Sequence, residues 1–449
     1  MRGRRTRLGL ILFALALLVP IAPTAASEDP TKPASTPGIP CEDSSLAETG
    51  VQGDIPAEDV ASGRMNKGYF CNAQLRSHTG VGGGFRIERY VDKAGHVCAY
   101  FDSGTLFPGT IHPEGSGVWV LDMADPARPR LTATLSTPAM LTPHESLRLN
   151  QKRGLLAAVA GNLFTNAGIV DVYSVADDCR APTLLSSTPL GILGHESAFA
   201  PDGNTFYATS IAGLITAIDV SNPASPSLIW TSTEWGPHGV SVSDDGNTLF
   251  MADQGEFKGL VILDVSQVQA RTPNPVVPEL SRLTWPEVSI PQNATPFRSR
   301  GHDYVVETDE FGGGNAPVGA ARIINVDDLH RPRLVSHLRL AVHNQQNADK
   351  TAHYCTVPSR IDPYIIACGM LYSGLRIFDV RDVTQPREVA YANVPDDKGP
   401  WGSAYSAPAY DPENNDVWYS DGPSGFYVIH LTPGSGVKQF ARAYALPGS

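Results

Sequence analysis

Gly259-Leu260-Val261-Ile262-Leu263-Asp264-Val265 is the stretch that decides the fold, because the chain repeats it. Clear copies lie at residues 118–123, 215–220, 322–326 and 375–380, each with an Asp or Asn seven residues before a Pro. Weaker copies lie at residues 168–173 and 425–430. Seven copies of one short, Val- and Ile-rich phrase indicate a repeat architecture built from strands.

Each copy belongs to a wider unit. In one unit, residues 237–242 and 248–253 flank the turn Ser243-Asp244-Asp245-Gly246-Asn247, which is typical of a hairpin. The repeated phrase follows as a third strand, and residues after a Pro, such as 333–338, form a fourth. Four strands in about 40–50 residues are typical of a propeller blade. We therefore predict an all-β, seven-bladed β-propeller of four-stranded blades over residues 67–449.

The ring of blades must close, because an open ring exposes an unpaired strand edge. Residues 69–75 resemble a fourth strand that has no third strand before it. We expect this N-terminal strand to pair with residues 426–431 and to complete the last blade.

The N-terminus is typical of an exported protein. Four Arg residues precede an apolar run over residues 8–19, and Thr24-Ala25-Ala26 offers small residues for cleavage. We predict a signal peptide over residues 1–26 and, from its Pro, Ser and acidic composition, a disordered lead-in over residues 27–66. Residues after 26 include no run long enough to span a bilayer. The predicted location is secreted or extracytoplasmic.

The charge of the chain limits its partners. Removing residues 1–26 removes four Arg and no acidic residue, so the formal charge falls from −12 to −16. An acidic protein without basic clusters is a poor partner for nucleic acid. We expect a monomer that binds a small ligand or another protein.

Six cysteines in an exported chain indicate disulfides, with 15 possible connectivities. Cys355 and Cys368 fall on the two strands of one predicted hairpin, where a cross-strand bridge can form. We predict that bridge. The sequence leaves the connectivity of Cys41, Cys71, Cys98 and Cys179 open.

The candidate functional residues begin the innermost strands, which line the channel of a propeller. Histidines occupy this position in blades two, three, four and six, and a Gln occupies it in blade five. The predicted ligand-binding residues at the channel mouth are His144, Glu145, His195, Glu196, His238, Gln292 and His353.

A ring of imidazoles beside carboxylates suits zinc or another transition metal, with His144, His195, His238 and His353 as ligands. The same ring could hold an anion or a polar substrate. A purely structural role, in which each His bonds the next blade, is the third alternative. Strand alternation predicts that each His and the Glu after it point to opposite faces.

Two groups of acidic residues have other expected roles. Asp122, Asp219, Asp264 and Asp379 end the repeated phrase, where an Asp commonly accepts backbone N–H bonds. Loops such as Asp309-Glu310-Phe311 enter the mouth with the histidines and could add oxygen ligands.

The phrase Leu260-Val261-Ile262-Leu263-Asp264 resembles the repeat of the LVIVD-repeat family, and Asp219-Val220-Ser221-Asn222-Pro223 fits its Asp-Val-Ser-Asp-Pro pattern. The resemblance covers residues 69–431 and implies a secreted or surface β-propeller, with no catalytic residues to transfer. The first functional hypothesis is an exported ligand-binding or protein-interaction module acting through its channel mouth. The alternative is a metal-dependent extracellular hydrolase or oxidoreductase whose cofactor is a transition metal or zinc, so catalysis and the cofactor stay open.

Overall fold

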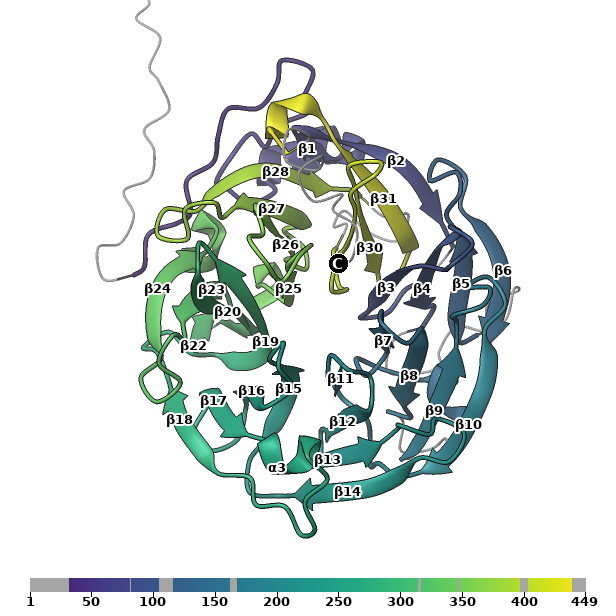
Figure 1. The fold of residues 1–449 in the computed structure, drawn as a ribbon. Helices are drawn as coiled ribbons and strands as arrows, with labels where there is room; N and C mark the ends of the chain where they lie inside the picture. Colours follow the sequence, from purple (N-terminus) through teal and green to yellow (C-terminus); the bar gives the residue numbers. More distant parts are fainter. Residues whose placement is uncertain are drawn as a thin grey trace, which may run out of the picture.

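Seven antiparallel sheets form a ring around a central axis in the computed structural model of the protein (Figure 1). The structure describes residues 32–80, 82–104, 116–161, 168–313, 316–345, 348–395 and 403–437. The predicted signal peptide lies outside these residues. Each sheet contains the four strands of one predicted blade, so the predicted seven-bladed β-propeller is confirmed.

The first four blades follow one another along the chain, innermost strand first. Blade one contains β3 (Ile87–Val91), β4 (Val97–Asp102), β5 (Val118–Asp122) and β6 (Arg130–Leu135). Blade two contains β7 (Arg148–Asn150), β8 (Leu155–Val159), β9 (Ile169–Ser174) and β10 (Thr183–Pro189). Blade three contains β11 (Ala198–Phe199), β12 (Thr205–Ser210), β13 (Leu214–Asp219) and β14 (Ser227–Ser232). Blade four contains β15 (Pro237–Val242), β16 (Thr248–Asp253), β17 (Gly259–Asp264) and β18 (Glu279–Leu283).

The last three blades include additions to this pattern. Blade five contains β19 (Ile290–Ser299), β20 (His302–Glu310), β23 (Ala321–Asn325) and β24 (Arg333–Leu338), with the small hairpin β21 (Gly312–Gly313) and β22 (Ala316–Val318) inserted. Blade six contains β25 (Tyr354–Thr356), β26 (Ile365–Gly369), β27 (Leu375–Asp379) and β28 (Arg387–Asn393), extended by β1 (Tyr69–Cys71). Blade seven contains β29 (Ala409–Asp411), β30 (Asp416–Asp421), β31 (Gly425–Leu431) and β2 (Ala73–Thr79).

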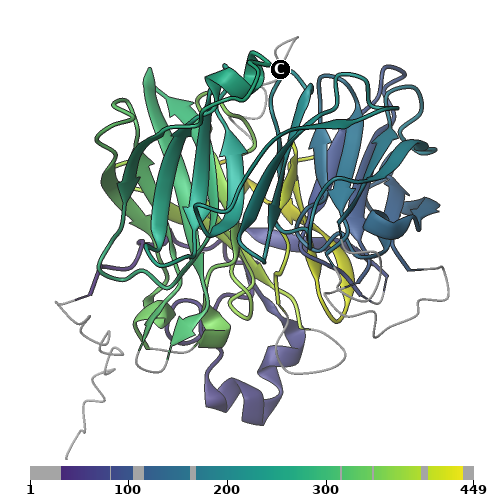
Figure 2. The ribbon, with the colours of Figure 1, turned by 90° about the horizontal axis from the view of Figure 1, so that it is seen from below.

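Short helices lie in the connections and in the lead-in. They are α1 (Ala57–Ser62), η1 (Arg64–Lys67), α2 (Pro138–Leu141), α3 (Ser266–Gln269), η2 (Ala341–Gln345), η3 (Ala348–Lys350) and η4 (Pro433–Ser435). Figure 2 shows α1 projecting beyond one end of the ring. In the described part of the chain, every helix is too short or too polar to cross a membrane.

The core lies mainly between the blades, because an apolar cluster joins the facing sides of each pair of neighbours. Tyr100 of blade one packs in one cluster with Leu156 of blade two, for example, and Val172 of blade two packs with Phe206 of blade three. Blades seven and one meet in the same way through Trp418. Burial of this apolar surface stabilises the fold only if every blade has both neighbours in place.

Ring closure follows the prediction in part. β2 pairs with β31 from Ala73 opposite Leu431 to Thr79 opposite Phe426, so an N-terminal strand does complete blade seven. The predicted segment 69–75 is nevertheless divided, because β1 pairs with β28 in blade six. Asn72 separates the two strands with a φ of 50°, a left-handed conformation that Asn tolerates better than most residues.

Residues 32–66 carry defined structure, whereas their composition predicted disorder over residues 27–66. A disulfide joins Cys41 to Cys71 of β1, and Gly38 forms a parallel bridge with Glu388 of β28. Glu48 pairs with the fully buried Arg376 of blade six. A covalent bond and a buried ion pair to a distant blade hold this segment, and composition does not reveal either contact.

The predicted disulfide is confirmed. Cys355 and Cys368 lie directly opposite each other on β25 and β26, with their Cα atoms 4.1 Å apart. Cys98 and Cys179 form a third bridge, which links blades one and two.

The repeated Asp of the strand phrase has the expected structural contact. In each of four blades its carboxylate accepts the backbone N–H two residues further on, at 2.9 to 3.0 Å. The four residues are Asp122, Asp219, Asp264 and Asp379.

We predict that a chain beginning at Gly82 does not unfold cooperatively, because loss of β1 and β2 exposes the edges of β28 and β31. Chemical denaturation followed by circular dichroism measures this. A chain beginning at Lys32 is the control and should unfold in one transition. Equal cooperativity of the two chains would contradict closure by β2.

Replacing both Cys355 and Cys368 with Ala should lower the free energy of unfolding by roughly 2–3 kcal/mol, because the unfolded chain gains the entropy of a short open loop. Denaturant titration of oxidised protein measures the loss. Adding a reductant should change the stability of the variant less than that of the wild type. An unchanged midpoint for the oxidised variant would count against this bridge as a stabilising link.

Candidate functional site

Four histidine side chains meet at one end of the channel. His144 precedes β7, His195 precedes β11, His238 lies on β15 and His353 directly precedes β25. Each is at most 6% exposed. The ring centroids of His144 and His195 lie 4.6 Å apart, and those of His195 and His238 lie 4.3 Å apart.

Glu145 lies among these imidazoles. Its Oε1 is 3.6 Å from Nε2 of His144 and 3.7 Å from Nε2 of His353, and its Oε2 is 3.2 Å from Nδ1 of His195. One ligand atom from each of His144, Glu145 and His195 lies within 4.8 Å of the others. The three side chains are therefore close enough to share one ion.

A second carboxylate, Glu310 at the end of β20, completes the cluster. Its Oε1 lies 3.5 Å from Nε2 of His238, and its Oε2 lies 3.2 Å from Nε2 of His353. The sequence placed Glu310 in a loop at the mouth but did not single it out. We call the four histidines together with Glu145 and Glu310 the channel cluster.

The expected separation of each His from the following Glu does not hold for His144 and Glu145, which both lie in the cluster. His144 has a φ of 52°, and regular pairing in blade two begins only at Arg148. Period-two alternation applies only to extended strands. Phe311, beside Glu310, also has a positive φ, of 49°. Such strained residues cluster at functional sites.

Backbone carbonyls of the next blade fix three of the rings. Nδ1 of His195 donates to the carbonyl oxygen of His238 at 3.0 Å, and Nδ1 of His238 donates to that of Pro291 at 2.7 Å. Nδ1 of His353 donates to the carbonyl oxygen of Tyr405 at 2.5 Å. A carbonyl oxygen only accepts, so Nδ1 carries a proton, and in the neutral form of the ring the lone pair is on Nε2. Metal-binding histidines are commonly oriented in this way.

His144 differs in detail from the other three. Its Nδ1 has no partner of good hydrogen-bond geometry among the described residues. Burial lowers the pKa of His144 to about 4, and the Glu145 carboxylate and the Gly194 carbonyl oppose this shift. The ring is therefore neutral near pH 7.

Burial and neighbouring groups also shift the pKa values of the other side chains in the cluster. Burial lowers the pKa of His238 well below its ordinary value. Although burial opposes both shifts, a hydrogen bond to Glu310 raises the pKa of His353, and the surrounding imidazoles hold the pKa of Glu145 well below its ordinary value. Burial raises the pKa of Glu310. Glu145 is thus an anion in contact with at least one neutral imidazole.

Gln292 orients Glu145 rather than joining the ring of histidines. Its Nε2 donates to Oε2 of Glu145 at 2.5 Å and to Oη of Tyr354 at 2.7 Å. All three side chains are at most 3% exposed. These hydrogen bonds fix the carboxylate within the cluster.

Glu196 lies beside the cluster and pairs with a different group. Its Oε1 is 3.2 Å from Nη2 of Arg86 and accepts a hydrogen bond from Asn293. Arg86 in turn lies over the ring of Tyr354, at 5.0 Å from its centroid. Burial raises the pKa of Glu196 to about 7. The predicted site residue Glu196 therefore lies beside the channel cluster, but it pairs with Arg86 and not with the histidines.

Several buried polar atoms here have no hydrogen-bond partner among the described residues. They are Nε of Arg86, Nδ1 of His144, Oε2 of Glu196 and Oε1 of Gln292. Buried polar atoms normally bond to protein, water or a ligand. The channel therefore offers unused hydrogen-bonding capacity next to the cluster.

Two other places could be mistaken for the site. Asp92, His96 and Asp178 also lie close together, but Asp92 accepts hydrogen bonds from His96 and from the backbone of Cys179. This group therefore holds the loops beside the Cys98–Cys179 disulfide.

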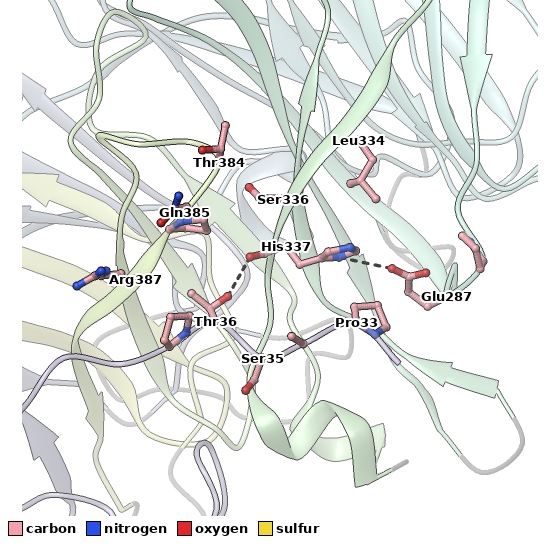
Figure 3. A pocket seen from close by; sticks show the side chains of 14 residues that line it. Pro33, Ser35, Thr36, Glu287, Leu334, Ser336, His337, Thr384, Gln385 and Arg387 are labelled. Carbon is pink, nitrogen blue, oxygen red and sulfur yellow. Dashed lines mark hydrogen bonds and ion pairs between the residues drawn. The ribbon is translucent and has the colours of Figure 1, made fainter. Parts of the chain in front are cut away.

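The second place is a cavity of about 560 Å³ at the outer rim, between residues 33–37, Glu287 and the outer strands of blades five and six (Figure 3). Nδ1 of His337 there lies 3.5 Å from Oε1 of Glu287, and burial lowers the pKa of His337 to about 4. The predicted site residues do not line this cavity.

These features define the class of the protein, a seven-bladed β-propeller with an imidazole–carboxylate cluster in its channel. Residues 207–233 and 238–269 match the family model of the LVIVD repeat, so the chain carries LVIVD repeats, as its strand phrase predicted. Among curated proteins, none matches the sequence.

The chain is similar in structure to a chain of a solved structure titled "Crystal Structure of Mitotic Checkpoint Complex". The TM-score is 0.53 and the sequence identity 11%, with 81% of this chain and 96% of that chain covered. At this identity the likeness shows the fold alone.

Replacing Arg86 with Met should lower the free energy of unfolding by roughly 3–5 kcal/mol, because the buried Glu196 loses its nearer cationic partner and Arg148 lies 4.0 Å away. The double variant Arg86→Met, Glu196→Gln should recover part of this loss. Denaturant titration of both proteins measures the difference. Arg128→Met is the matched control, because its partner Asp125 is exposed and the pair should contribute at most about 1 kcal/mol. An Arg86→Met variant as stable as the control would refute the role of this pair.

Proposed function

We propose that this protein is an exported ligand-binding module whose channel cluster binds a transition metal ion or zinc. Three disulfides support an oxidising compartment, in agreement with the predicted signal peptide. The formal charge of −16 without the first 26 residues does not suit a nucleic-acid partner.

One observation carries the proposal, the spacing between imidazole nitrogens and carboxylate oxygens. Ligand atoms about 2.0–2.1 Å from a tetrahedral zinc ion lie about 3.3–3.4 Å from one another. The separations between an imidazole Nε2 and a carboxylate oxygen in the channel cluster are 3.2 to 3.7 Å. Most are too long for good hydrogen bonds. They suit side chains arranged around an ion.

The orientation of the rings supports the same function. Hydrogen bonds from Nδ1 direct the Nε2 atoms of His238 and His353 toward Glu310. A neutral imidazole binds a metal without first losing a proton. Glu145 adds the negative charge that a cation requires in a buried site.

The alternative is a metal-dependent extracellular hydrolase or oxidoreductase. The grouping of His144, Glu145 and His195 favours it, because three protein ligands leave a fourth position open for water or substrate in catalytic zinc sites. Such an ion would activate a bound water or polarise a substrate. The binding function and the enzyme therefore use the same residues.

We predict that metal-free protein binds about one Zn²⁺ or Cu²⁺ per chain, and that the double variant His144→Ala, His195→Ala loses this binding. Calorimetric titration measures stoichiometry and affinity, and thermal unfolding verifies that the variant still folds. The control is His302→Asn, because His302 is exposed and pairs with Asp327 away from the channel. Binding that is absent from the wild type, or unchanged in the double variant, would contradict the site.

Turnover separates the two candidate functions. Hydrolysis of chromogenic ester or phosphoester probes by the Zn²⁺-loaded protein, lost in the double variant, would favour a hydrolase. Stoichiometric metal binding without turnover of these probes, or of dioxygen by the Cu²⁺ form, would favour the binding module.

A further inference from the structure

Exposed apolar side chains lie in described connections close to the charged channel cluster. Four large apolar side chains at this end of the ring are more than a third exposed, which we call the apolar rim. They are Leu141 at 38%, Ile192 at 50%, Ile211 at 45% and Phe311 at 42%.

The chain places these residues beside the histidines. Leu141 precedes His144 by three residues and Ile192 precedes His195 by three, so both lie on the connections that lead into the cluster. The backbone N–H of Ile211 donates to the carbonyl oxygen of Leu193, which holds the β12–β13 turn against the same connection. Two neighbouring blades thus present three aliphatic side chains at one mouth.

Phe311 faces the cluster from blade five. Its ring centroid lies 6.3 Å from that of His353, and it directly follows Glu310. Its backbone has a positive φ, which is costly for a bulky residue unless the surroundings require it. An exposed aromatic ring is thus held next to a coordinating group.

A second aromatic ring borders the cluster from blade one. Phe85 lies 5.0 Å from the ring of His144 and 5.6 Å from that of His353, and it is only 7% exposed. A molecule that reaches the metal position therefore contacts Phe85 near the metal and the apolar rim further out. Apolar walls with a few polar groups at the centre are typical of small-molecule sites.

We infer that the ligand of the channel centre is a small apolar molecule with one metal-coordinating group. This inference rests on the proposed metal site. The coordinating atom binds the ion held by the channel cluster, and the apolar part of the molecule lies against Phe85, Phe311 and the aliphatic residues of the rim. Burial of apolar surface then supplies affinity that coordination alone does not.

The test compares two probes with the same coordinating group. Imidazole and 4-phenylimidazole both coordinate through a ring nitrogen, and only the second has an apolar arm. Calorimetric titration of the Cu²⁺-loaded protein should show that 4-phenylimidazole binds at least about tenfold more tightly than imidazole.

The preference should shrink in the double variant Ile192→Ser, Ile211→Ser, which changes two exposed aliphatic side chains of the rim and leaves the metal affinity unchanged. Leu228→Ser is the matched control, because Leu228 is 54% exposed on the outer strand β14, away from the channel. The control should keep the full preference.

Equal affinity for the two probes, or a preference that the rim variant retains in full, would overturn the inference while the metal site stands. Copper titration of the metal-free protein is a separate measurement, and its failure would overturn the metal site and the inference together.

Discussion

Pairing of β2 with β31 is the constraint on which the rest of the structure depends. It joins residues near the start of the chain to the last blade and so gives every blade two neighbours. The apolar clusters between blades bury their surface only in a closed ring. The channel cluster depends on closure too, because its members come from five different blades.

The lead-in reinforces the same closure. Cys41 is bonded to Cys71 of β1, and β1 extends blade six while β2 completes blade seven. Ile55 and Met65 of the lead-in pack with Tyr69 of β1 and Tyr391 of β28 in one cluster. The N-terminal segment therefore links the two blades at which the ring closes, and this gives its disulfide a structural role.

The fold could be predicted from the sequence because the same strand motif occurs seven times, once in each blade. It also indicated where the channel histidines begin their strands, since a repeat places equivalent residues at equivalent positions. It did not predict the position of Glu145 beside His144, because a single residue with positive φ removes the strand alternation on which that expectation rested. Glu310 was missed because it lies at the end of β20, the second strand of its blade, whereas the sequence analysis compared only the starts of the innermost strands.

The amino-acid composition of the lead-in also did not predict its ordered structure. Its partners, Arg376 and Glu388, are more than 300 residues away along the chain. Pairing of β1 with β28 brings the lead-in beside blade six, where both partners lie. Contacts of such sequence separation leave no local pattern, whereas hairpin turns and strand phrases do.

Anomalous X-ray diffraction from crystals of the metal-loaded protein tests the central claim most directly. Data collected at the zinc or copper absorption edge should show one strong peak within about 2.0–2.2 Å of an Nε2 atom of the channel cluster and of an oxygen of Glu145 or Glu310. A channel without such a peak, with ordered water between the imidazoles and the carboxylates, would contradict it and leave the four histidines as structural residues that bond one blade to the next.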